Sequence, residues 1–432
     1  MSFLFDFLSA SNQFLWNGPL LILLLFTHMF FTIRLGFVQR RIPTALRLSA
    51  SGPKKQGLRS LTTALAATLG TGNIVGVSSA VALGGPGAVF WCWITGLLGM
   101  ATAYAECYLC MKYRQPDDNS SIRGGIMYVL EQGVKSKAAG KFYALLILVA
   151  SFGIGCSTQA GTVTETVSAL TDLTPTVTGL LLVLAVGYVI LHGSSAITKL
   201  CSILVPSMAC AYLLTCLVIL LLNHSYLFPS LRLILTSAFT PTAAIGGIAG
   251  GSFLFSARYG IARGLFTNEA GLGTAPLAFT GDKESSPEKA ALLSMSAVFW
   301  DTIILCALTG ILIVSSLLRN PSLAEAYTAT TLTSAAFSLL PFGEVILSFS
   351  LIAFAYATLI GWSYFGAQGV QYLFGRESLK TYRLCYLGMI FIGSVMSLPL
   401  IWEMTDFINA CMALPNVAAL FLLRREIRPP KD

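Results

Sequence analysis

The sequence predicts an all-α integral membrane protein with eleven transmembrane helices, and three observations lead to this fold class. The 432 residues are 55% hydrophobic and only 11% charged, whereas soluble domains usually carry ~25% charged residues. Apolar stretches long enough to cross the ~30 Å hydrocarbon core recur along the whole chain. Two of these stretches are crowded with glycine, which destabilises a helix interior by ~1 kcal/mol per residue relative to alanine. This composition excludes a soluble enzyme or a nucleic-acid binder, despite the net charge of +8.

The expected spans follow one another with short connections and leave no long polar segment for a second domain. We therefore expect residues 1–432 to form one transmembrane unit. In it, a helix at 18–38 precedes two sets of five helices, at about 58–222 and 240–424. The predicted spans are 18–38, 58–82, 88–113, 140–171, 176–195, 198–222, 240–263, 290–318, 343–374, 383–402 and 403–424.

Basic residues set the expected orientation, because cytoplasmic loops carry an excess of Lys and Arg. They are concentrated in 39–59, in 112–141 and after residue 423, which places these segments in the cytoplasm. Arg258 and Arg263, near the end of the seventh span, are assigned to the same side. We thus expect an external N-terminus and a cytoplasmic C-terminus in a bacterial cytoplasmic membrane. A basic n-region and a small-residue cleavage site are missing at the start, so no removable signal peptide is predicted.

The glycine-rich segments lie at 70–87 and 246–273, in the second and seventh spans. These spans start on opposite sides of the membrane and lie five helices apart, which is typical of an inverted-repeat transporter with two broken helices. Unwound backbone at membrane depth is tolerated only where it lines a cavity. Half-helix N-termini there attract a carboxylate, and freed carbonyls can bind a cation. The alternative is that the glycines only allow close packing of helices.

Four blocks of sequence, in order, resemble the alanine/glycine:cation symporter family. They are AATLGTGNIVGV at 66–77, GGPGAVFW at 84–91, RYGIARGLFTNEAGLG at 258–273 and FAYATLIGW at 354–362. The similarity covers roughly residues 15–425. It implies sodium-coupled import of a small neutral amino acid, such as alanine or glycine, by a leucine-transporter-type fold. Cys92 and Gly161 stand where the family usually has Met and Asn, and Gly161 is near the expected pocket.

The resemblance implies contacts to the substrate at both breaks and on two other helices. Backbone amides at the first break would bind the carboxylate, and carbonyls at the second would bind the ammonium group. Gln159 has interhelical hydrogen bonding as its alternative role, and Phe255 has simple core packing. Thr358 and Trp362 share one helix face because they are four residues apart. The expected substrate-binding residues are Thr71, Gly72, Asn73, Gln159, Gly250, Gly251, Phe255, Thr358 and Trp362.

Sodium is the coupling ion that the resemblance implies. Its expected ligands are the carbonyls of Ala66 and Leu69, the side-chain oxygen of Asn73 and the hydroxyl of Thr358. Three further residues, Arg258, Arg263 and Glu269, are expected to form a cytoplasmic gate by ion pairing. Asp301 is a charge within a span, which costs ~2.5–3.5 kcal/mol on insertion scales, but it has no evident partner in the sequence.

The sequence also bears on other possible functions. A nucleotide-binding loop of the form G-x-x-x-x-G-K-[ST] does not occur, so the energy for transport has to come from an ion gradient. Proton coupling is the main alternative, with Glu165 or Asp301 as the titrating group. A channel would need a repeated pore loop or several subunits, and an intramembrane enzyme would need paired acids or a His-metal cluster. The expected partners are the amino acid and the lipid bilayer, with no obligate protein partner.

Overall fold

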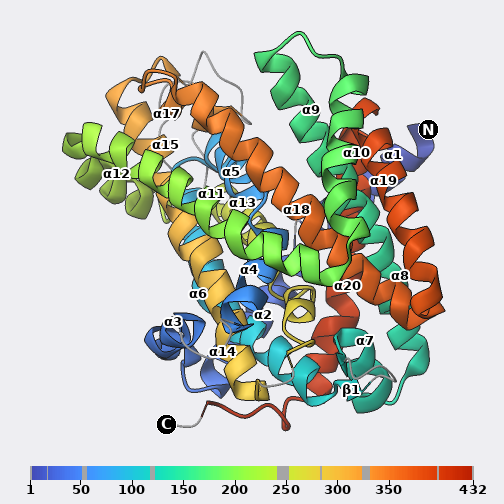
Figure 1. Cartoon of the computed structure of the whole chain (residues 1–432). Helices are drawn as coiled ribbons and strands as arrows, with labels where there is room; N and C mark the ends of the chain where they lie inside the picture. The colour runs from blue at the N-terminus through green and yellow to red at the C-terminus, as the bar shows by residue number, and fades with distance from the viewer. Residues whose placement is uncertain are drawn as a thin grey trace.

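The computed structural model describes residues 2–16, 18–50, 56–116, 122–240, 253–282, 285–323, 331–396 and 398–430. These residues form a bundle of helices (Figure 1) with one antiparallel pair of short strands, β1 (Gln115–Pro116) and β2 (Ile122–Arg123). The helices are α1 (Ser2–Trp16), α2 (Pro19–Arg34), α3 (Ile42–Ala50), α4 (Gln56–Thr68), α5 (Val75–Gly84), α6 (Gly87–Lys112), α7 (Ile126–Tyr128), α8 (Lys137–Phe152), α9 (Thr158–Leu170), α10 (Pro175–Leu191), α11 (Ser194–Leu222), α12 (His224–Ser237), α13 (Phe253–Asn268), α14 (Pro287–Val298), α15 (Ala307–Arg319), α17 (Leu332–Phe337), α18 (Gly343–Phe374), α19 (Leu379–Val395) and α20 (Leu398–Leu422).

Seven helices in the described part of the chain are long and apolar enough to cross a membrane. An eighth span is a bent pair, Gly57–Thr68 and Thr71–Gly84, whose two halves meet at 67°. The predicted spans at 176–195 and 383–402 correspond to α10 and α19, which are 17 residues each. The fold class of a helical membrane protein is therefore confirmed, while the count of eleven spans stays a prediction.

Helices α1 and α12 were not among the predicted elements. The first span is preceded by α1, which packs against α20. The sixth predicted span is followed directly by α12. This helix contains polar residues and Pro229, so its sequence did not predict a membrane span. Both helices are too short to count as separate spans, at 15 and 14 residues.

Two long helices contain π-helical segments. The segment η5 (Gly153–Ser157) joins α8 to α9, and η7 (Phe299–Cys306) joins α14 to α15. Such segments interrupt the regular hydrogen-bond ladder and occur often at functional sites. A Cβ atom on Gly155 would lie 2.2 Å from Cβ of Trp362. The close contact between η5 and α18 is therefore possible only because residue 155 is glycine.

Helix α6 lies at the centre of the bundle, and α13 and α14 pack most extensively against it. Glycines of α13 face it: a Cβ on Gly264 would lie 1.9 Å from Oγ1 of Thr95, and one on Gly260 would lie 2.2 Å from the carbonyl oxygen of Ala88. These glycines let two helices meet at backbone distance. Part of the glycine enrichment between 246 and 273 is therefore explained by packing.

The two ends of the bundle differ, and we name them by helices α3 and α17. The C-terminus, α3, α7 and β1 gather at the α3 end (Figure 1), whereas α17, the end of α9 and the N-terminus lie toward the other. Lys112 Nζ pairs with Glu426 Oε2 at 2.7 Å at the α3 end, where Arg34 Nε also donates to the carbonyl of Arg424. Segments predicted to be cytoplasmic thus share one end of the molecule.

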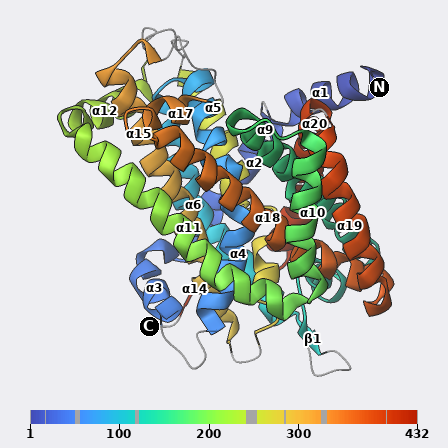
Figure 2. The same cartoon turned by 45° about the horizontal axis from the view of Figure 1, so that its top comes forward.

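In both views, α11 crosses the bundle obliquely over α4 and α18 (Figure 2).

The structure corrects the expected location of Arg258 and Arg263. Helix α13 packs on α5 and on the start of α6, with the Cβ of Tyr259 at 3.0 Å from the Cβ position of Gly84. Arg258 therefore lies near the Gly84 end of these helices, opposite the segments predicted to be cytoplasmic. The charge count misplaced both arginines because it assumed that the seventh span ends at 263.

Candidate functional site

The first predicted break is present, at Leu69–Ile74 between α4 and α5. The amide of Gly70 donates to the carbonyl of Thr68 at 2.8 Å, instead of to the carbonyl of Ala66, its partner in a continuous α-helix. A short 3-10 turn, η3 (Thr71–Asn73), follows before α5 begins at Val75. Backbone groups that a helix would satisfy internally are thus turned toward other elements.

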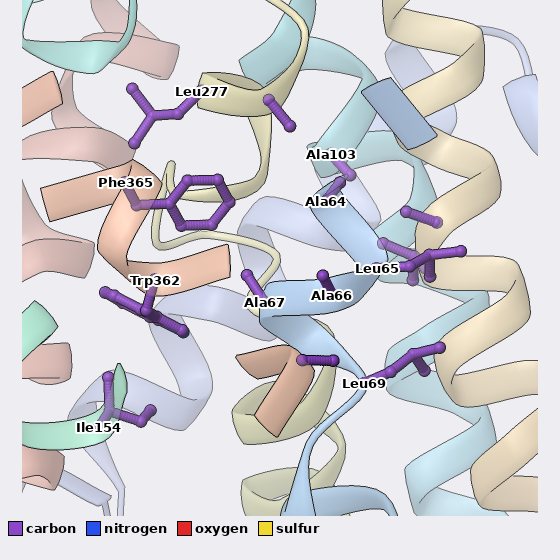
Figure 3. Close-up of a cluster of buried hydrophobic side chains, with 14 of the residues drawn as sticks. Ala64, Leu65, Ala66, Ala67, Leu69, Ala103, Ile154, Leu277, Trp362 and Phe365 are labelled. Carbon is purple, nitrogen blue, oxygen red and sulfur yellow. The ribbon is translucent and has the colours of Figure 1, made fainter. Parts of the chain in front are cut away.

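The predicted sodium ligands Leu69 and Thr358 lie together on the break and on α18. Oγ1 of Thr358 is 3.4 Å from the carbonyl oxygen of Leu69 and also donates to Phe354 O at 3.0 Å. The close approach of α18 depends on Gly361, whose Cβ position lies 2.7 Å from N of Ala67 and 3.1 Å from C of Ala66. Figure 3 shows Ala66, Ala67 and Leu69 on this interrupted element, with Trp362 on the neighbouring helix.

Gln159 and Thr71 meet at the same point. Oγ1 of Thr71 is 3.5 Å from Oε1 of Gln159, and Nε2 of Gln159 donates to the carbonyl of Ile154 in η5. The Cβ position of Gly70 lies 3.0 Å from Oγ1 of Thr358 and 3.7 Å from Oε1 of Gln159. Three polar side chains from α9, α18 and η3 therefore surround one glycine of the break.

Trp362 is fully buried, at 0% exposure, and lies one helical turn beyond Thr358. Its side chain packs against Gly155 of η5 and meets the ring of Phe365 edge-on at 5.8 Å between centroids. The tryptophan is thus fixed in position beside the break.

Asp301, which the sequence left without a partner, is bound to Asn73. Nδ2 of Asn73 donates to Oδ1 of Asp301 at 2.7 Å, and Oγ1 of Thr302 donates to the second carboxylate oxygen at 2.8 Å. Oδ1 of Asn73 is buried and has no hydrogen-bond partner among the described residues. The π segment η7 thus places the carboxylate of Asp301 behind the break, next to the unpaired amide oxygen of Asn73 in η3.

The second predicted break, at Gly250 and Gly251, falls outside the described residues and stays a prediction. Helix α13 runs from Phe253 through Asn268 without interruption. Phe255 is 48% exposed and stacks on Tyr259, and its predicted contact with the substrate stays a prediction. On the same helix, Phe266 lies about three turns further along and contacts the first break at Gly72.

The chain leaves the helix after Asn268, in the segment 269–274. Glu269, Gly271 and Gly273 have φ of +52°, +98° and +78°, values in the left-handed region that favours glycine. This segment, the anchored loop, is held by three helices. Gly271 N and Nδ2 of Asn416 both donate to Oε1 of Glu106 on α6, at 2.8 and 2.6 Å. The hydroxyl of Tyr143 on α8 donates to Leu272 O at 2.6 Å.

The end of α13 touches the first break. The Cβ position of Gly72 lies 3.2 Å from Cγ2 of Thr267 and 3.5 Å from the ring of Phe266. The signal for these residues was in the sequence, because Phe266 and Thr267 belong to the third family-like block. The predicted contacts of the seventh span were placed at Gly250, Gly251 and Phe255 instead.

The expected ion pair between Glu269 and the arginines is not formed in the described part of the chain. Glu269 is buried and accepts a hydrogen bond from Thr274. The guanidinium of Arg258 lies 5.0 Å from the ring centroid of Tyr259, and that of Arg263 lies 5.9 Å from Phe266. At ~1.5 Å per residue, the helical path separates Arg258 from Glu269 by about 16 Å.

A cavity of 540 Å³ leads from the first break toward the α17 end; we call it the main cavity. Thr71 and Gly72 lie at its deep end, and Ser334 and Ser348 lie near α17 and the start of α18. Two charged residues face it, Glu165 from α9 and Arg263 from α13. The cavity thus connects one side of the bundle with the polar cluster at the break.

This arrangement, a broken helix at the base of a cavity in a helical bundle, is that of a membrane transporter. The solved structure of a manganese transporter from Eremococcus coleocola, in complex with an aromatic bis-isothiourea substituted compound, has a similar fold. Its TM-score is 0.54 at 14% identity, covering 85% of this chain and 77% of that one.

Residues 1–429 match the model of the Sodium:alanine symporter family, and the chain belongs to this family. It is 42% identical to the sodium/alanine symporter AgcS of Methanococcus maripaludis, over 97% of this chain and 95% of that protein. It is 32% identical to the probable sodium/glutamine symporter GlnT of Bacillus subtilis, over 96% and 88%. The chain is therefore a secondary transporter of amino acids coupled to sodium, and not an enzyme.

Proposed function

We propose that this protein imports a small neutral amino acid, such as alanine or glycine, together with sodium by alternating access. The observation that carries the proposal is the cluster of Thr71, Gln159 and Thr358 around Gly70, at the base of the main cavity. A pore would need a filter, but this cavity ends on buried side chains. A membrane potential of 100 mV contributes ~2.3 kcal/mol to transport for each charge that crosses the membrane. This free energy is enough for ~50-fold accumulation of a neutral substrate.

In this proposal the amino acid lies against η3. Its carboxylate faces the amides of Thr71, Gly72 and Asn73, where the start of α5 adds the positive end of a helix dipole. The side-chain amide of Gln159 can donate to the same carboxylate. Phe266 and Trp362 limit the room beyond the α-carbon, which favours alanine or glycine over larger amino acids. The ammonium contacts expected from Gly250 and Gly251 stay a prediction.

Sodium binds in this proposal where α18 meets the break. The carbonyl of Leu69 and the hydroxyl of Thr358 are 3.4 Å apart, and the carbonyl of Ala66 has lost its helical partner. Oxygen ligands of this kind suit a hard cation. The unpaired Oδ1 of Asn73 and the carboxylate of Asp301 provide a further place for positive charge, whether a second sodium ion or a proton.

Closing of the main cavity requires groups on its two walls. Arg263 and Glu165 face the cavity from α13 and α9, and they carry opposite charges. We propose that these two residues, rather than Arg258 or Glu269, approach each other when the substrate is enclosed. The two sets of five helices, the bacterial cytoplasmic membrane, the external N-terminus and the cytoplasmic C-terminus remain parts of this proposal.

Uptake of labelled alanine into proteoliposomes tests the proposal. Accumulation should require an inward sodium gradient, and a pH gradient alone should not support it. Thr358→Val removes a neutral oxygen ligand from the sodium ion, which should weaken sodium binding by about 1.5–3 kcal/mol. Half-maximal alanine uptake should then need about 10–100 times more sodium. Thr215→Val is the matched control, because Thr215 bonds only its own helix on an exposed face of α11.

Two results would contradict the proposal. Alanine uptake that follows a proton gradient without sodium would establish proton coupling, with Asp301 as the first residue to substitute. Equal sodium dependence in Thr358→Val and in the wild type would remove the hydroxyl from the sodium site.

A further inference from the structure

A second cavity, of 200 Å³, lies between α1, α13 and α20; we call it the side cavity. Arg263 and Phe266 line both this cavity and the main cavity. The two spaces are thus separated by side chains of one helix face, and a ligand in the side cavity would lie next to the route to the break.

The side cavity carries charges of both signs on opposite walls. Arg258 and Arg263 come from α13, and Glu403 and Asp406 come from α20. Each arginine also lies over an aromatic ring of its own helix, which positions the guanidinium groups. Charges within a membrane protein are costly and mark ligand pathways more often than structural contacts. The walls therefore offer one positive and one negative face across a small space.

Helix α1 covers this space and leaves an acceptor without a donor. Nδ2 of Asn12 donates to Oε2 of Glu403 at 2.6 Å and to its backbone carbonyl at 2.8 Å. Nε1 of Trp16 donates to the carbonyl of Asp406 at 3.1 Å. Asn12 is only 7% exposed, yet its Oδ1 has no hydrogen-bond partner among the described residues. Buried polar atoms of this kind are satisfied by a ligand or by water.

We propose that the side cavity binds an amino-acid zwitterion before it enters the main cavity. Its carboxylate faces Arg258 and Arg263, and its ammonium group faces the carboxylates of α20 and Oδ1 of Asn12. The orphaned acceptor decides the orientation, because only the ammonium end supplies N–H donors. The inference rests on the proposed function, since it assumes that the transported class of molecule is the ligand.

Binding stoichiometry tests the inference on the full-length protein. Labelled alanine is titrated in saturating sodium against protein in nanodiscs of phosphatidylglycerol, a lipid without an amine. The wild type should bind two alanines per chain. Arg258→Gln should bind one, because Arg258 lines only the side cavity, and Glu403→Gln should do the same if the first variant folds poorly. Lys112→Gln, at the α3 end, is the control and should bind two.

The other outcomes separate this inference from the proposed function. One alanine per chain in both the wild type and Arg258→Gln would overturn the second site and leave the transport proposal intact. Two per chain in both would place the second alanine elsewhere and would also overturn it. No binding in the wild type would refute the transport proposal itself. Phosphatidylethanolamine that co-purifies with the wild type but not with Arg258→Gln, combined with a single alanine, would assign the side cavity to a lipid headgroup instead.

Discussion

The two interruptions of the bundle differ in how they are held. At the first, around Gly70, the neighbours are the polar side chains of Gln159 and Thr358, and the main cavity ends there. The anchored loop at 269–274 is instead tied to α6, α8 and α20 by hydrogen bonds of 2.6–2.8 Å to Glu106, Tyr143 and Asn416. The comparison teaches that one interruption presents polar side chains beside a cavity, whereas hydrogen bonds to neighbouring helices fix the other.

Matched alanine substitutions test this difference, and the larger effect on stability is expected at the anchored loop. Gly271→Ala would place a Cβ 2.5 Å from Cδ2 of Leu24, at a φ of +98°. A left-handed non-glycine residue costs ~1–3 kcal/mol, and overpacking adds to this. The thermal midpoint of the purified protein should fall. Gly388→Ala is the control, because nothing lies within 4 Å of its Cβ position, and its midpoint should be unchanged or slightly higher.

The same substitution at the first break should change function more than stability. Gly70 has an extended backbone, with φ of −116°, so alanine is allowed there, but its Cβ would crowd the Thr358 hydroxyl. We expect Gly70→Ala to keep the wild-type thermal midpoint and to need about tenfold more sodium for half-maximal alanine uptake, which is ~1.4 kcal/mol. If Gly70→Ala lost stability and Gly271→Ala lost only transport, the contrast between the two breaks would be reversed.

The smallest expected effect lies outside the membrane-spanning helices. Hydrogen bonds from Lys112 and Tyr113 lower the pKa of Glu426 below its ordinary value of 4.5. A lowered folded-state pKa stabilises the folded protein above the unfolded-state pKa, and the contribution is lost as the pH falls through the folded value. Glu426→Gln should therefore lower stability at pH 7 by less than about 1 kcal/mol and have a smaller effect at about pH 3. Thermal midpoints at the two pH values measure this difference.

Hydropathy and glycine content predicted the bundle and the first break, because both depend on local sequence. Ala66, Leu69, Thr358 and Trp362 were predicted from the family-like blocks, and Gln159 from the family resemblance. The structure brings Thr358 and Gln159 within 4 Å of the Cβ position of Gly70. Glycine content did not distinguish the glycines of the second glycine-rich segment by their roles, and the break predicted at Gly250 and Gly251 falls outside the described residues. Gly260 and Gly264 serve helix packing, whereas the left-handed backbone at Gly271 and Gly273 belongs to the anchored loop.

Long-range pairing was the other limit of the sequence. The partner of Asp301 is Asn73, 228 residues away, and no periodicity within either helix reveals such a contact. The side cavity likewise combines α1 with α20, from opposite ends of the chain. Charge counting failed for Arg258 and Arg263 because it depends on where each span ends.

The π segments have a consequence for comparing relatives of this protein. One extra residue in a helix turns everything beyond it by about 100°. If an alignment ignores a one-residue gap inside 299–306, the residues beyond the gap are assigned to the wrong face of the helix. The carboxylate of Asp301 would then be drawn facing away from Asn73, although the two residues are still in contact in the protein. Helical wheels for such homologues should be drawn separately on each side of the bulge.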